Sequence, residues 1–157
     1  MKVYLIHHTD ALSAEQDPGR HISEKGKAQA DRLGERLRAL GARPVRIVHS
    51  AKQWTIDTAE RIAAKLGLEE RTAQAAYPIA TDDPVEPFIA EIAGAGGDVM
   101  MCGHFDYLER TAARLVCGSE ATKVVAFKPG NGTTVCLEGE GAEWVIRWMW
   151  RDDHTPG

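Results

Sequence analysis

Lys2-Val-Tyr-Leu-Ile-His7 is an unbroken run of strand-forming residues, and a second histidine, His8, follows it directly. A run of this kind is typical of a strand that is buried on both faces. Two further apolar runs, Val45–His49 and Asp98–Cys102, are separated from it and from each other by stretches with helical spacing. Strands that alternate with helices indicate a sheet covered by helices on both sides. We therefore expect a three-layer α/β/α sandwich with a mostly parallel central sheet.

Apolar spacing predicts four helices. Ser23 is suited to cap the first helix, which carries a buried stripe of Ala30, Leu33, Leu37 and Leu40. The other helices are expected over Gln53–Leu66, Val85–Ala93 and Phe105–Cys117, with a loop over Tyr77–Pro84. The last third of the chain predicts short strands at Lys123–Phe127, Thr133–Glu138 and Glu143–Trp150, of which the final two form an antiparallel hairpin. The whole chain, 1–157, is expected to form one domain.

Composition excludes several classes of protein. A net charge of −4, with lysines and arginines scattered rather than clustered, argues against nucleic acid as a partner. No apolar stretch approaches the ~18 residues that a membrane span needs, so no membrane partner is expected. The three cysteines, Cys102, Cys117 and Cys136, fit buried reduced thiols in a reducing compartment, and we expect a cytoplasmic protein. The sequence does not determine the oligomeric state.

Histidines gather at the predicted strand ends. His7 and His8 end the first strand, His49 ends the second, and His104 follows the third. In an open α/β sheet, ligands bind outside the carboxyl ends of the strands, so these side chains are expected at one edge. His21 lies in the first loop. The sequence therefore predicts a functional site built around histidines.

Four stretches in order along the chain resemble the motifs of one family. They are Val3-Tyr-Leu-Ile-His-His-Thr-Asp-Ala11, Arg20-His-Ile-Ser-Glu-Lys-Gly-Lys-Ala-Gln-Ala30, Val48-His-Ser-Ala-Lys-Gln-Trp-Thr-Ile-Asp-Thr-Ala59 and Met100-Met-Cys-Gly-His104. In this order they resemble the histidine phosphatase superfamily, whose fold is phosphoglycerate mutase-like, and within it the short branch of SixA-type phosphohistidine phosphatases. The resemblance covers nearly the whole chain.

The resemblance implies roles for particular residues. His8 would be the nucleophile that forms a phosphohistidine intermediate, and His104 would contact the phosphoryl group. Arg20 aligns with a phosphate-pocket residue. The proton donor of many family members would lie after the second helix, where Asp82, Asp83 and Glu86 are the candidates. No cofactor is implied, and the substrate would be a phosphorylated small molecule or a protein phosphohistidine.

Three positions depart from the family's pattern. His7 stands where the family has its first pocket arginine, Thr9 where it has glycine, and Trp54 where it has its second arginine. Arginine supplies a permanent charge and a bidentate fork, so its loss weakens the hold on a phosphoryl group. His7, when protonated, and Lys52 could replace part of that charge.

Three functions remain open at this point. The first is a working phosphomonoesterase or phosphohistidine phosphatase, a hydrolase weakened by the missing arginines. The second is a degenerate family member, a pseudoenzyme that binds a ligand or partner without turnover. The third is a metal site made of His7, His8, His49 and His104, with His21 and Asp10 nearby, because imidazoles bind zinc, nickel and copper.

Overall fold

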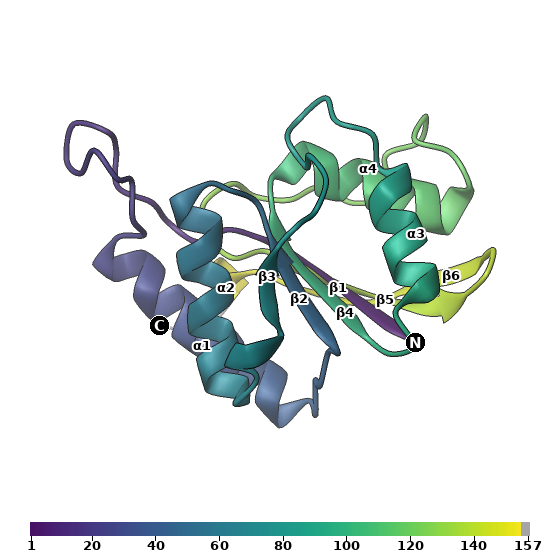
Figure 1. Cartoon of the computed structure of the whole chain (residues 1–157), viewed down its shortest axis with the longest axis horizontal. Coiled ribbons are helices and arrows are strands. Elements are labelled where there is room, and N and C mark those ends of the chain that lie inside the picture. The colour runs from purple at the N-terminus through teal and green to yellow at the C-terminus, as the bar shows by residue number, and fades with distance from the viewer. Residues whose placement is uncertain (155–157) are drawn as a thin grey trace.

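Six strands form one sheet in the order β3-β2-β4-β1-β5-β6 in the computed structural model, which describes residues 1–154 (Figure 1). The strands are β1 (Lys2–His7), β2 (Arg46–His49), β3 (Thr72–Gln74), β4 (Val99–Gly103), β5 (Thr134–Glu140) and β6 (Glu143–Trp150). The helices are α1 (Glu24–Ala39), α2 (Gln53–Leu66), α3 (Glu86–Gly94) and α4 (Phe105–Cys117), with short 3₁₀ turns η1 (Glu69–Arg71) and η2 (Asp152–His154). The last residues of the predicted domain, 155–157, lie outside the described residues.

The sheet is mixed. Strands β3, β2, β4 and β1 pair in parallel, whereas β5 pairs antiparallel with both β1 and β6. The register places His7 opposite Gly103 and His49 opposite Cys102, so three parallel strands end at nearly the same level. The expected parallel core with an antiparallel hairpin at its C-terminal side is confirmed.

Two hydrophobic cores lie on opposite faces of the sheet, as the pleat of a strand requires. Val3 and Leu5 of β1 belong to the core that includes side chains of α3 and α4, whereas Tyr4 and Ile6 belong to the core that includes side chains of α1 and α2. Figure 1 shows α1 and α2 on one side of the sheet and α3 and α4 on the other. The three-layer α/β/α arrangement therefore follows from alternating burial along a central strand.

Several local expectations hold and others are wrong. Ser23 caps α1, and its Oγ accepts the amide hydrogen of Gly26 at 3.0 Å. The predicted strand at Lys123–Phe127 is absent, because this segment is a coil that leads into β5. The short edge strand β3 was not predicted. Cys117 is exposed, unlike the buried Cys102 and Cys136. Among the helices of residues 1–154, none combines the length and apolar character needed to cross a membrane.

Candidate functional site

The site lies where β1, β2 and β4 end. His8 leaves β1 immediately after His7, and His104 leaves β4 immediately after Gly103 and begins α4. The centroids of the His7 and His8 rings are 4.2 Å apart, and those of His8 and His104 are 6.1 Å apart. The neighbouring histidines do not diverge as they would in a regular strand, because β1 ends at His7.

His8 is held in one tautomer by its own backbone. Its Nδ1 lies 2.9 Å from the carbonyl oxygen of Thr9, and a carbonyl can only accept. Nδ1 therefore carries the hydrogen, and Nε2 keeps a free lone pair. Burial lowers the pKa of His8 to about 4, helped by the nearby His104 and Arg20. The ring is thus a neutral imidazole at neutral pH, which is the form that acts as a nucleophile.

His7 is also neutral. Burial lowers its pKa to about 3, and the neighbouring His8 contributes. This lowered pKa argues against the expectation that a protonated His7 replaces a missing arginine at physiological pH. Its Nδ1 lies 3.0 Å from both the amide nitrogen of Gly130 and the carbonyl oxygen of His8. The amide can only donate and the carbonyl can only accept, so the two contacts favour opposite tautomers, and in either tautomer the neutral ring keeps one N–H donor.

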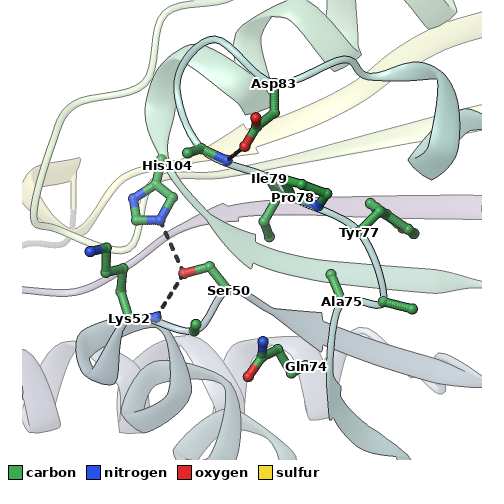
Figure 2. A pocket seen from close by; sticks show the side chains of 12 residues that line it. Ser50, Lys52, Gln74, Ala75, Tyr77, Pro78, Ile79, Asp83 and His104 are labelled. Carbon is green, nitrogen blue, oxygen red and sulfur yellow. Dashed lines mark hydrogen bonds between the residues drawn. The ribbon is translucent and has the colours of Figure 1, made fainter.

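His104 is anchored by a serine. Its Nε2 lies 3.0 Å from Oγ of Ser50, which also contacts Oγ1 of Thr55 at 2.8 Å and accepts the amide hydrogen of Lys52 at 3.2 Å. Figure 2 shows Ser50 between His104 and the backbone of Lys52. Burial lowers the pKa of His104, and the charge of Lys52 adds to this effect. Ser50 therefore orients a neutral second histidine.

Arg20 supplies the guanidinium of the site. Its Cζ lies 4.3 Å from the ring centroid of Trp54, within the range of a cation–π contact. Its Nε donates to the carbonyl oxygen of Leu12 at 3.0 Å. The residue has a φ of 50°, and Asp17 holds this uncommon turn by accepting from the amides of Gly19, Arg20 and His21. The guanidinium is therefore positioned before any ligand arrives.

Two cavities meet at His104. The smaller, of about 220 Å³, contains the histidine pair, Arg20 and Trp54; its lining residues are His7, His8, Arg20, Trp54, Thr81, His104, Phe105 and Pro129. The larger, of about 410 Å³, is bounded by the loop after β3 and by the start of α2 (Figure 2). We call them the phosphoryl cavity and the side cavity.

The structure places the remaining predicted residues unevenly. Thr9 is fully buried, and its amide and hydroxyl contact Oγ1 of Thr58 rather than the phosphoryl cavity. Lys52 lines the side cavity, with its Nζ 5.9 Å from the Trp54 ring centroid. Asp83 also lines the side cavity, where its carboxylate accepts the amide hydrogen of Ala80 at 2.6 Å.

The other two acids lie elsewhere. Asp82 is exposed in the loop before α3, and Glu86 at the start of α3 pairs with Arg114 at 3.1 Å. Of the three acidic candidates, Asp83 is therefore the one that shares a cavity with His104.

The metal alternative lacks an assembled set of ligands. His49 is buried with its Nδ1 on the carbonyl of Ser50 at 2.8 Å, and His21 pairs with Asp57 at 2.9 Å. Asp10 contacts Ser23 and Gln29. Across residues 1–154, no three His, Cys, Asp or Glu side chains are grouped so that they could hold a metal ion.

Sequence reasoning missed the residues contributed by loops. Ser50 follows β2 inside a recognised motif, and its position at a strand end was a usable signal. Thr81, Phe105 and Pro129 reach the phosphoryl cavity through tertiary packing. The amide of Gly130 reaches His7 because β5 pairs with β1 across most of the chain's length, and no local pattern encodes that contact.

The fold and site define an α/β sandwich with paired histidines and a guanidinium at the ends of its parallel strands. Residues 4–76 match the family model of the histidine phosphatase superfamily (branch 1). No curated protein sequence matches the chain significantly.

Solved structures extend the similarity to the whole fold. The protein histidine phosphatase SixA complexed with tungstate superposes with a TM-score of 0.82 at 16% identity, covering 98% of this chain and 99% of that chain. A candidate SixA phosphohistidine phosphatase from Agrobacterium tumefaciens gives 0.74 at 20% identity, with 99% and 98% covered. A mycobacterial glucosyl-3-phosphoglycerate phosphatase with VO3 gives 0.68 at 14%, with 94% and 97% covered. The chain therefore has the fold of the histidine phosphatase superfamily, and residues 4–76 carry its sequence pattern.

Proposed function

We propose that the protein is a phosphatase that hydrolyses phosphomonoesters or phosphohistidine through a phosphohistidine intermediate on His8. One observation carries this proposal: the Nδ1–H of His8 is held by the Thr9 carbonyl, and the ring is neutral at pH 7. The Nε2 lone pair is therefore available for attack on phosphorus. The superfamily fold, and neighbours whose structures hold tungstate or VO3, support a site for a tetrahedral oxyanion.

The proposed reaction has two steps. Nε2 of His8 forms a bond to phosphorus while the bond from phosphorus to the leaving group breaks, and the leaving group takes the electron pair and a proton. Asp83, at the side cavity, is the proposed donor of that proton for an ester. Water then attacks the phosphorus of the phosphohistidine, and the bond from phosphorus to Nε2 breaks with its electron pair returning to the ring, which releases inorganic phosphate and restores the neutral imidazole.

The groups that would stabilise negative charge on the phosphoryl group differ in strength. Arg20 is a permanent cation, and His7 and His104 are neutral donors in a partly buried cavity. Each lost charge-assisted hydrogen bond costs about 1.5–3 kcal/mol. Two missing arginines are thus expected to slow turnover on the order of 10²–10⁴-fold relative to a complete site.

The same losses favour a second candidate function. A site with one guanidinium, stacked on Trp54, is suited to bind a phosphorylated ligand or protein without turnover. Both functions use the same pocket, and they differ only in whether the bond from phosphorus to the leaving group is broken.

The test is hydrolysis of p-nitrophenyl phosphate from pH 5 to 8, with and without chelator, by the wild type and by His8→Ala. Turnover that survives chelation and needs His8, with an acid-labile phosphoenzyme trapped on the wild type, supports the phosphatase. A folded wild type that binds phosphate but never turns over supports the binding protein. Turnover that persists in His8→Ala contradicts the proposed nucleophile.

A further inference from the structure

The side cavity is an independent feature of the site. It measures about 410 Å³, within the range of pockets that hold small organic groups. It opens beside His104, the residue that also lines the phosphoryl cavity. A group bonded to a phosphorus atom held at His8 therefore has space to extend past His104 into the side cavity.

One wall of the side cavity is small and apolar, and the polar side chains of Ser50, Lys52, Gln74 and Asp83 lie elsewhere in its lining. Ala75, Pro78 and Ile79 come from the loop after β3, and Figure 2 shows them along one side, opposite His104 and Lys52. Ala75 and Ile79 are buried. Alanine and proline present little bulk, so the cavity is wide enough for a flat group to lie against them.

Hydrogen bonds fix the loop after β3 at several points. The amide of Ala75 donates to the carbonyl of His49 at 2.9 Å, and the hydroxyl of Tyr77 is hydrogen-bonded to Glu91 on α3. Asp83 accepts from the amide of Ala80 at 2.6 Å. The shape of the cavity is therefore set before a substrate binds.

We propose that the side cavity binds the group attached to phosphorus and selects substrates in which that group is a planar aromatic or heteroaromatic ring. The inference rests on the proposed function for the position of the phosphoryl group. A polyol or sugar would find partners for some of its hydroxyl groups at Gln74 and Asp83, but the hydroxyls against Ala75, Pro78 and Ile79 would have no side-chain partner. Unpartnered polar groups are costly to bury, whereas a ring gains from the same contact.

The charged residues at the cavity fit this role. Lys52 lies between the side cavity and Trp54, and so stands close to the ester or phosphoramidate linkage rather than against the apolar wall. Asp83 lies on the loop side. A matching substrate has an anionic phosphoryl group near Lys52 and an apolar group that extends from it along the apolar wall.

The test measures binding of three phosphonates that cannot be hydrolysed, by calorimetry on the full chain. Benzylphosphonate carries the ring, 2,3-dihydroxypropylphosphonate carries a polyol, and methylphosphonate reports the phosphoryl cavity alone. Benzylphosphonate is expected to bind at least about 10-fold more tightly than either of the others, from burial of the ring. Equal affinities for the ring and the polyol would overturn the inference, and the phosphatase proposal would still stand on turnover.

Filling the side cavity gives the second arm. Ala76 is exposed and lines the cavity, so Ala76→Leu is expected to fold and to remove most of the benzyl advantage while leaving methylphosphonate unchanged. Ala121→Leu, on an exposed loop away from both cavities, is the matched control. An undiminished benzyl advantage in Ala76→Leu counts against the side cavity as the ring site. If none of the three phosphonates binds the wild type, the inference about the side cavity fails, and the phosphatase proposal is judged separately by turnover of p-nitrophenyl phosphate.

Discussion

The guanidinium of Arg20 lies over the indole of Trp54, with Cζ 4.3 Å from the ring centroid. The indole also lies in T-shaped arrangements with the rings of His8 and His104, at centroid separations of 5.9 and 6.4 Å. Trp54, at the position where the resemblance would place an arginine, thus holds Arg20 in position. The phosphoryl cavity has one well-oriented guanidinium.

Restoring the arginine at this position should raise turnover. Trp54→Arg loses a cation–π contact of about 0.5–2 kcal/mol and gains a charge-assisted hydrogen bond to phosphate of about 1.5–3 kcal/mol. We expect kcat/KM for an aryl phosphate to rise by about 10-fold. Trp54→Phe is the control, since it keeps an aromatic face without adding charge, and should not raise the rate. A lower rate in Trp54→Arg would show that orientation of Arg20 matters more than the number of cations.

Turnover should not increase as the pH falls from 8 to 5. The pKa of His7 is about 3 and that of His8 about 4, so both rings stay neutral over this range. Below about pH 5, activity should decline because protonation removes the Nε2 lone pair of His8. The measurement is kcat/KM against pH for the wild type and for His7→Gln, which keeps an uncharged donor. An acid-side increase that disappears in His7→Gln would contradict the neutral state of His7.

The stability of the fold should fall in mild acid. His7 and His8 have pKa values below the ~6.5 of an unfolded histidine, so the unfolded chain binds more protons below that pH. Stability is then lost as the pH drops from about 6.5 towards 4, at about 1.4 kcal/mol per pH unit for each histidine. Urea unfolding at pH 7 and pH 5 measures this slope. His7→Asn should reduce this slope, and an unchanged slope in His7→Asn would contradict a buried, neutral His7.

Ser50 should act through His104. Ser50→Ala removes the partner of Nε2, which frees the ring to rotate and to exchange tautomers. We expect kcat to fall about 10-fold, corresponding to one neutral hydrogen bond, with a smaller change in KM. Ring ¹⁵N shifts of His104 should change in the same variant. Ser23→Ala removes a serine that caps α1, and should lower stability without altering these shifts.

The sequence predicts the parts of this protein that depend on local patterns. The alternation of apolar runs and helical stripes placed α2, α4 and β6 at their observed bounds, because each has a long periodic signal and clear ends. The histidines at the strand ends followed from the same reasoning. Strand β3 was not predicted, because a strand of three residues is too short to show a periodic pattern and its position depends on pairing with β2.

The protonation state of the histidines was harder to predict from the sequence than their position in the fold. A sequence places His7 beside His8, but the pKa of each ring depends on how far water is excluded. The burial of His7 against the loop at Gly130 lowers the pKa of its ring and so favours the neutral form over the expected cation. Thr9 likewise turned towards Thr58 because the chain leaves β1 at His7.

The contacts between the loop at Gly130–Gly132 and the two N-terminal histidines have a consequence for the order of folding during synthesis. The amide of Gly130 reaches Nδ1 of His7, and that of Gly132 reaches the carbonyl of His8 at 3.4 Å. His8 is synthesised well before this loop, and its surroundings are completed by residues made more than a hundred positions later along the chain. A nascent or truncated chain that ends before β5 should therefore expose the histidine pair to water and lack a competent site.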